Sequence, residues 1–168
     1  TLQSVPSHRN IVISGPCFPA QTVILATEIC SLGDLDGWFL KKPHSIGEKI
    51  DLMEQACSGL LHLHSQQPPV LHKNIKPQNL FLQQKGRNVV LKLADFALTS
   101  LVQNLLLVSY TGSGIFQAPE VHLDVNAHTK ESDLFALGLL FQAMLLFKQG
   151  NRHLRPHIGM VFCRACCT

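Results

Sequence analysis

Three cysteines near the end of the chain are close enough in sequence to suggest metal binding. Cys163, Cys166 and Cys167 include one C-x-x-C pair, a spacing found in many zinc sites. A structural zinc ion takes about four ligands, and no second C-x-x-C pair accompanies this one. We therefore favour free, reduced cysteines in an unstructured tail over a zinc site.

Five short segments with polar and charged residues occur in a fixed order along the chain. They are residues 8–12 (HRNIV), 27–35 (TEICSLGDL), 72–79 (HKNIKPQN), 94–97 (ADFA) and 118–120 (APE). Together with Ser132 and Asp133 before an apolar segment, they resemble the eukaryotic protein kinase domain over roughly residues 7–147. Within that family, residues 133–144 and 27–28 are most similar to the nuclear serine/threonine kinases that interact with PDZ-LIM proteins.

The resemblance places Asn74 where a working kinase has the aspartate that orients the substrate hydroxyl and accepts its proton. A carboxamide can hold the hydroxyl by a hydrogen bond but is not basic near neutral pH. Lys76 would neutralise the transferring phosphoryl group, and Asp133 would hold the backbone of the catalytic loop. Lys73 replaces the arginine that clamps an activation-loop phosphate, so activation by phosphorylation is not expected.

The resemblance also implies residues that would bind adenine. Thr27 would be the gatekeeper beside the base, and the hinge from Glu28 to Cys30 would pair with it through backbone groups. The alternative is that these are residues at the end of a strand with no ligand. Phe81 would lie beneath the base, where its ring either stacks on adenine or fills the pocket in its absence.

Two residues would hold the metal ion of a bound nucleotide. Asn79 and Asp95 supply the oxygen ligands that suit Mg²⁺, which takes its other ligands from phosphates and water. Ala97 stands where the family has glycine, and its Cβ restricts the backbone of this segment.

The resemblance implies a partial domain. Residues 1–7 contain neither the family's glycine-rich loop nor its phosphate-binding lysine, and residues 148–168 resemble none of its last helices. We expect residues 1–30 to be the end of the small lobe and the hinge, residues 31–147 the core of the large lobe, and residues 148–168 a divergent, loosely attached tail. ATP and Mg²⁺ are then expected as ligands of a longer parent protein, and to bind poorly to this part alone.

Hydrophobic patterns predict the elements that position these residues. They favour an α+β fold that is mainly helical, with a small sheet, as the large lobe of a kinase with the last strands of its small lobe would be. The predicted elements are strands at 11–13 and 22–27 around a turn at 14–16, a helix at 46–64, strands at 80–82 and 89–93 around a turn at 85–88, and a buried helix at 130–147.

Composition restricts the partners. The chain has 168 residues, of which 46% are hydrophobic and 15% charged, as expected for one folded domain. A formal charge of +3 is too small to indicate nucleic acid, and the apolar stretch 134–147 is shorter than the roughly 20 residues of a membrane helix. Lone cysteines and no recognisable signal segment favour the cytoplasm or the nucleus. We expect protein partners, with no nucleic acid and no membrane.

Three functions remain open at this stage. The first is a pseudokinase that Asn74 impairs. The second is an active serine/threonine kinase that transfers the γ-phosphate of ATP to protein hydroxyls, since phosphoryl transfer depends mainly on positioning and electrostatics. The third is an interaction scaffold that binds no nucleotide, which Phe81 and the apolar segment 101–108 favour.

Overall fold

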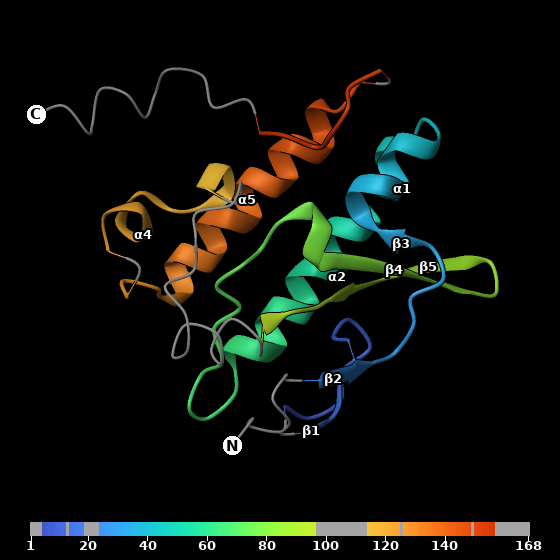
Figure 1. Cartoon of the computed structure of the whole chain (residues 1–168). Coiled ribbons are helices and arrows are strands. Elements are labelled where there is room, and N and C mark those ends of the chain that lie inside the picture. Colours follow the sequence, from blue (N-terminus) through green and yellow to red (C-terminus); the bar gives the residue numbers. More distant parts are fainter. Residues whose placement is uncertain are drawn as a thin grey trace, which may run out of the picture.

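Two long helices and a small antiparallel sheet form the framework of the domain (Figure 1). The computed structural model describes residues 5–12, 14–18, 24–96, 114–124, 126–148 and 150–156. The strands are β1 (Ser14–Phe18), β2 (Ile24–Thr27), β3 (Gly33–Asp34), β4 (Leu80–Lys85) and β5 (Asn88–Leu93), and the helices are α1 (Leu35–Lys41), α2 (Ile46–His64), α4 (Pro119–Leu123) and α5 (Lys130–Leu146), with 3₁₀ turns η1 (Pro77–Asn79) and η2 (Gly114–Phe116). The α+β fold predicted from the sequence, mainly helical with a small sheet, is confirmed.

Helix α2 has the bounds that the sequence predicts, because its start is encoded locally. The Ser45 hydroxyl accepts a hydrogen bond from the backbone N–H of Glu48, and the Glu48 carboxylate accepts one from the backbone N–H of Ser45. This reciprocal pair satisfies donors that the first helical turn leaves free. The helix then buries Leu52, Leu60 and Leu63 on one face.

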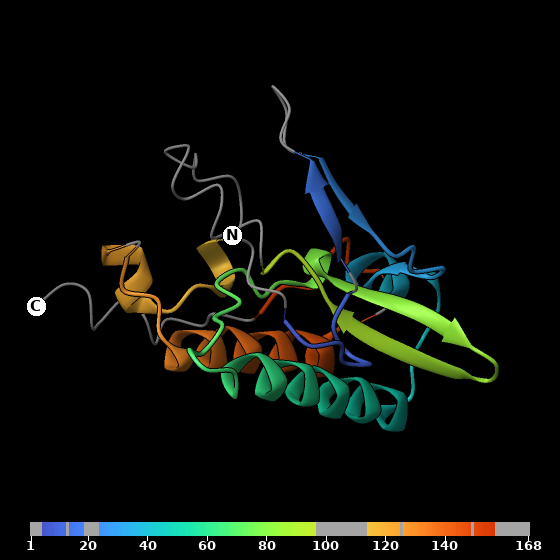
Figure 2. The ribbon, with the colours of Figure 1, turned by 90° about the horizontal axis from the view of Figure 1, so that it is seen from below.

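Helix α5 lies beside α2 along most of its length (Figures 1 and 2). Thr129 and Ser132 cap its first turn in the same reciprocal way, and the helix buries Leu140 and Met144 in the core. The predicted end at Phe147 is one residue too late, since Phe147 is the cap. No helix among the described residues is long and apolar enough to cross a membrane.

The sheet β3–β4–β5 presents two different faces. Strands β4 and β5 form an antiparallel hairpin in which Leu82 is opposite Leu91 and Phe81 is opposite Lys92. Because directly opposed residues share a face, the leucines line the buried side, which packs on α2. Phe81 and Lys92 therefore belong to the other side of the sheet.

The first half of the chain differs from the predictions in three places. Of the predicted strand at 11–13, Ile11 makes only an isolated bridge to Leu93 and Val12 is in no strand. Residues 14–16 are not a turn but the start of β1, which pairs with β2 from Ser14 opposite Thr27. Glycine and proline at 15 and 16 misled the interpretation, because both are tolerated at the edge of a two-stranded sheet. Helix α1 has no predicted counterpart, since seven residues are too few to show a helical period.

The beginning of the tail is attached to the domain, contrary to expectation. Leu154 is buried, and its backbone N–H donates a 2.6 Å hydrogen bond to Asp36 of α1. His153 donates to the same carboxylate at 2.8 Å. These contacts are non-local, so no pattern within residues 148–168 predicts them.

Residues 10–12 pass close to the middle of α2. A Cβ atom built on Gly59 would lie only 2.8 Å from the backbone oxygen of Asn10 and 3.0 Å from the side chain of Leu93. Any side chain at this position would push residues 10–12 and β5 away from the helix.

We predict that Gly59→Ala lowers the free energy of unfolding by about 1–3 kcal/mol, because the clash is with backbone rather than with a movable side chain. Gly138→Ala in α5 is the matched control: its Cβ would meet nothing within 4 Å, so alanine should raise stability by up to about 1 kcal/mol through helix propensity. Urea unfolding measures both. Equal effects would contradict the close approach at Gly59.

Candidate functional site

The centre of the site is the buried carboxylate of Asp133, near the start of α5. It accepts hydrogen bonds from the backbone N–H groups of His72 and Lys73, both at 2.8 Å, and from His64 Nε2 at 2.9 Å. The carboxylate thus joins α2, α5 and the loop of residues 72–79, which we call the catalytic loop. The predicted role of Asp133 in holding this loop is confirmed.

Hydrogen bonding keeps Asp133 ionised. Burial by itself would raise the pKa of this carboxyl, but the donors from His64, His72 and Lys73 outweigh burial, and its pKa is lowered. A buried charge of this kind is tolerated only where its oxygens are satisfied.

The catalytic loop turns sharply at Lys73. This residue has φ = +66°, a left-handed conformation that is rare for a residue with a side chain. The hydrogen bond from its own amide to Asp133 holds it there. The turn therefore depends on Asp133. The placement of Asn74, the next residue in the loop, depends on it as well.

His72 supports the same turn from the interior. Its Nδ1 accepts a long, 3.4 Å hydrogen bond from the backbone N–H of Asn74, and its Nε2 has no partner among the described groups. Burial lowers the pKa of His72 to about 4. The ring is therefore neutral at neutral pH.

Asn74 is one of the residues that line a small pocket beside the start of α5. The pocket, about 20 Å³ in volume, is also lined by Phe116 and Gln117, and the side-chain oxygen of Gln117 is buried without a partner in the described part of the chain. This volume suits about one small polar group such as a hydroxyl or a water molecule.

Asn79 is oriented by the same loop. Its side-chain nitrogen donates to the backbone oxygen of Asn74 at 2.8 Å, so its side-chain oxygen points away from that carbonyl. The backbone oxygen of Asn79 accepts from the N–H of Ala94 at 3.0 Å. Because Asp95 follows Ala94 directly, the structure brings the two predicted metal residues to the same end of the β4–β5 hairpin.

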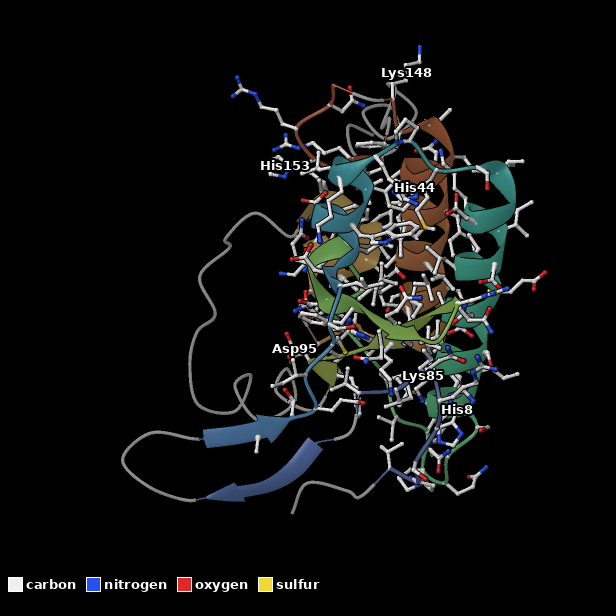
Figure 3. All side chains as sticks on the ribbon, turned by 90° about the vertical axis from the view of Figure 1, so that its right-hand side faces the viewer. His8, His44, Lys85, Asp95, Lys148 and His153 are labelled. Atoms are coloured by element: carbon white, nitrogen blue, oxygen red, sulfur yellow. The ribbon has the colours of Figure 1, made fainter. Side chains whose placement is uncertain are left out.

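Asp95 lies on the side of the domain from which the β1–β2 hairpin projects (Figure 3). It is half-buried and has φ = +65°. No group of three or more His, Cys, Asp or Glu side chains in the described ranges is arranged to hold a metal ion. One amide oxygen and one carboxylate do fit Mg²⁺ when phosphates and water supply the rest of its ligands.

The predicted hinge is tied to the sheet by an ion pair that the sequence analysis missed. Glu28 and Lys92 Nζ are 2.7 Å apart, and the lysine is 3% exposed. Lys92 lies opposite Phe81 in the β4–β5 hairpin. Nothing in the sequence indicates that its charged partner is Glu28, 64 residues earlier in the chain.

The other predicted adenine residues lie at the end of β2 and on β4. Thr27 is exposed, whereas Cys30 and Phe81 are half-buried. Burial, then the charge of Glu28, raises the pKa of the Cys30 thiol, so the thiol is protonated at neutral pH. Phe81 shares its face of the sheet with Lys92. Other sequence features lie outside the described residues, namely Ala97, the segment 101–108 and the cysteines from 163 onward.

The sequence of residues 1–156 matches the family described as protein kinase domain. Mitogen-activated protein kinase kinase kinase 7 of Drosophila melanogaster is 31% identical over 147 residues, covering 84% of this chain and 21% of the relative. A serine/threonine-protein kinase of Dictyostelium discoideum is 29% identical over 146 residues, covering 83% and 21%. Myosin light chain kinase A of the same organism is 27% identical over 142 residues, covering 83% and 47%. The chain thus spans between a fifth and a half of the length of these relatives.

We predict that His72 makes the domain less stable in mild acid. Its pKa is about 4 when folded against 6.5 ordinarily, so below pH 6.5 the unfolded chain binds a proton that the folded chain does not. Stability is therefore fully present above pH 6.5 and falls as the pH drops toward 4, by about 2 kcal/mol between pH 7 and pH 5. In His72→Phe that loss should be smaller by this amount in urea unfolding. An unchanged pH slope would show that the ring titrates normally.

Proposed function

The chain belongs to the protein kinase domain family, and we propose that, in the intact protein, it binds Mg²⁺-ATP but transfers phosphate far more slowly than a typical kinase. The observation that carries this proposal is the combination of an ordered catalytic loop with Asn74 at the position of the proton acceptor. The loop is held by Asp133, so the defect is one of chemistry and not of placement.

Asn74 supports binding of a substrate hydroxyl without activating it. Asn74 lines the small pocket with Phe116 and Gln117, where its amide oxygen could accept a hydrogen bond from a serine or threonine hydroxyl. The amide does not take up the proton, so the term that a general base supplies, about 10²- to 10⁴-fold in rate, is lost.

The electrostatic part of phosphoryl transfer would be supplied by Lys76, Asn79 and Asp95. Lys76 places a cation two residues after Asn74, and Asn79 with Asp95 would hold Mg²⁺ through one amide and one carboxylate oxygen. When bound, the metal ion neutralises the charge of the phosphates. These residues would orient the nucleotide even where transfer is slow.

The interaction scaffold is the second candidate, and the Glu28–Lys92 ion pair favours it. Glu28 is committed to a buried lysine, and Phe81 lies on the same face of the sheet as that lysine. A face closed in this way would bind no adenine and would serve only to hold a protein partner.

Three finer assignments are also proposals. Placement among the nuclear kinases that interact with PDZ-LIM proteins rests on residues 133–144 and 27–28 alone, since the relatives named above belong to other kinases. Location in the cytoplasm or nucleus rests on the spacing of the cysteines, which fits no disulfide framework, and on Cys30 and Cys57, which are free in the described part of the chain. Partners are proposed to be proteins, because the positive charge of the chain is too small to indicate nucleic acid.

Nucleotide binding is tested by thermal unfolding of the intact protein with and without Mg²⁺-ATP. At 100 times the dissociation constant, the ligand should add about 2.7 kcal/mol of stability. Asp95→Asn keeps a residue type that tolerates φ near +65° but removes the metal-binding charge, so the shift should be lost. Asp124→Asn, at an exposed position after α4, is the control and should keep the shift. No shift in the unmodified protein would leave the scaffold as the function.

Catalytic impairment is tested by radiolabelled phosphate transfer in the intact protein. We expect Asn74→Asp to raise the rate by about 10²-fold or more, because it restores a proton acceptor in a loop that is already held. Adding Lys76→Ala to that variant should remove most of the gain. Equal, robust transfer by the unmodified protein and by Asn74→Asp would show that the domain is an active kinase.

A further inference from the structure

A second and larger cavity lies beside Lys76. It has a volume of about 180 Å³ and is lined by Lys76 and Gln78 of the catalytic loop, Phe116 of η2, and His153 and Arg155 of the terminal segment. Phe116 also lines the small pocket at Asn74. The two cavities are therefore neighbours that share Phe116 as a lining residue.

The charge of this cavity is positive. Lys76 and Arg155 both line it, and no carboxylate in the described part of the chain forms an ion pair with either of them. Asp36 is the nearby acid, but it is 6% exposed and already accepts hydrogen bonds from Gln78, His153 and Leu154. Asp36 is therefore occupied by these bonds, and Lys76 and Arg155 have no carboxylate partner among the described residues.

Asp36 also makes the cavity a preformed feature. Its carboxylate holds Gln78 of the catalytic loop and His153 and Leu154 of the terminal segment, all three of which line the cavity. Figure 3 shows His153 near α1, the helix that carries Asp36. A site whose walls are already held loses little conformational entropy when a ligand enters.

We propose that this cavity binds an acidic side chain of a protein substrate or partner, next to the serine or threonine hydroxyl that Asn74 holds. The shared chemistry is an oxyanion, either the carboxylate of Asp or Glu or the phosphoryl group of a phosphoserine. Lysine and arginine donors form charge-assisted hydrogen bonds with such groups. The proposal rests on the proposed function, since it assumes that Asn74 faces the hydroxyl.

The probe is a short fluorescent peptide with one serine at its centre and glutamates on both sides. Its affinity for the intact protein, measured by fluorescence anisotropy without nucleotide, is compared with that of the same peptide carrying glutamines. We expect the glutamate peptide to bind about tenfold more tightly, with the difference shrinking at high salt. A third peptide, with phosphoserine in place of one glutamate, separates the two oxyanions, and tighter binding than glutamate would identify the phosphoryl group as the better ligand.

Arg155→Ala is the decisive variant, because Arg155 is exposed and lies outside the residues that position the hydroxyl or the metal. It should remove the preference for glutamate over glutamine and leave the affinity of the glutamine peptide unchanged. Lys148→Ala is the control, since this exposed lysine precedes the same segment without lining the cavity. It should keep the preference.

Several outcomes would overturn the proposal. They are equal affinity for the glutamate and glutamine peptides, a preference that survives Arg155→Ala, and displacement of the glutamate peptide by Mg²⁺-ATP, which would assign the cavity to a nucleotide phosphate. Failure of the proposed function is distinguishable, because it removes the thermal shift with Mg²⁺-ATP and leaves the peptide affinities as they are. In Arg155→Ala the thermal shift should persist.

Discussion

The candidate site depends on one buried carboxylate. Asp133 has three donors within 2.9 Å, and two of them are consecutive amides of the catalytic loop. Without this acceptor, the amides of His72 and Lys73 would be buried or half-buried without a partner, at a cost of about 1–3 kcal/mol each. Lys73 would also lose the bond that opposes its left-handed backbone. The loop continues from this turn to Asn74, Lys76 and Asn79. The positions of these three residues therefore depend on the bonds to Asp133.

The β4–β5 hairpin connects the two halves of the site. Asn79 precedes β4 and Asp95 follows β5, so the open end of the hairpin carries the proposed metal ligands. The bond between Ala94 and Asn79 closes that end at 3.0 Å. Further along the hairpin, Phe81 and Lys92 share the face toward the predicted hinge. One hairpin thus fixes the spacing between the proposed metal end and the proposed adenine face.

Elements with local causes were predictable from the sequence. Helix α2 and the hairpin β4–β5 follow from a capping box, a helical period and a polar turn, and the motif order identified Asp133 as the residue that holds the loop containing Asn74. Features that depend on residues far apart in the sequence were not predictable. The ion pair of Glu28 with Lys92 joins residues 64 positions apart, and the attachment of Leu154 to Asp36 joins residues 118 positions apart. Periodicity and propensity report on neighbours along the chain and carry no information about such pairs.

The position of Asn10 determines when the first part of the chain can fold during synthesis. Its side-chain amide donates to the backbone oxygen of Leu91 at 2.7 Å and to Gln55 at 3.1 Å. Neither partner exists when residue 10 leaves the ribosome, so Ile11 and Val12, which are buried in the finished domain, must wait until some eighty more residues have been synthesised. During translation this segment therefore exposes Ile11 and Val12, and such exposed apolar side chains are what chaperones bind.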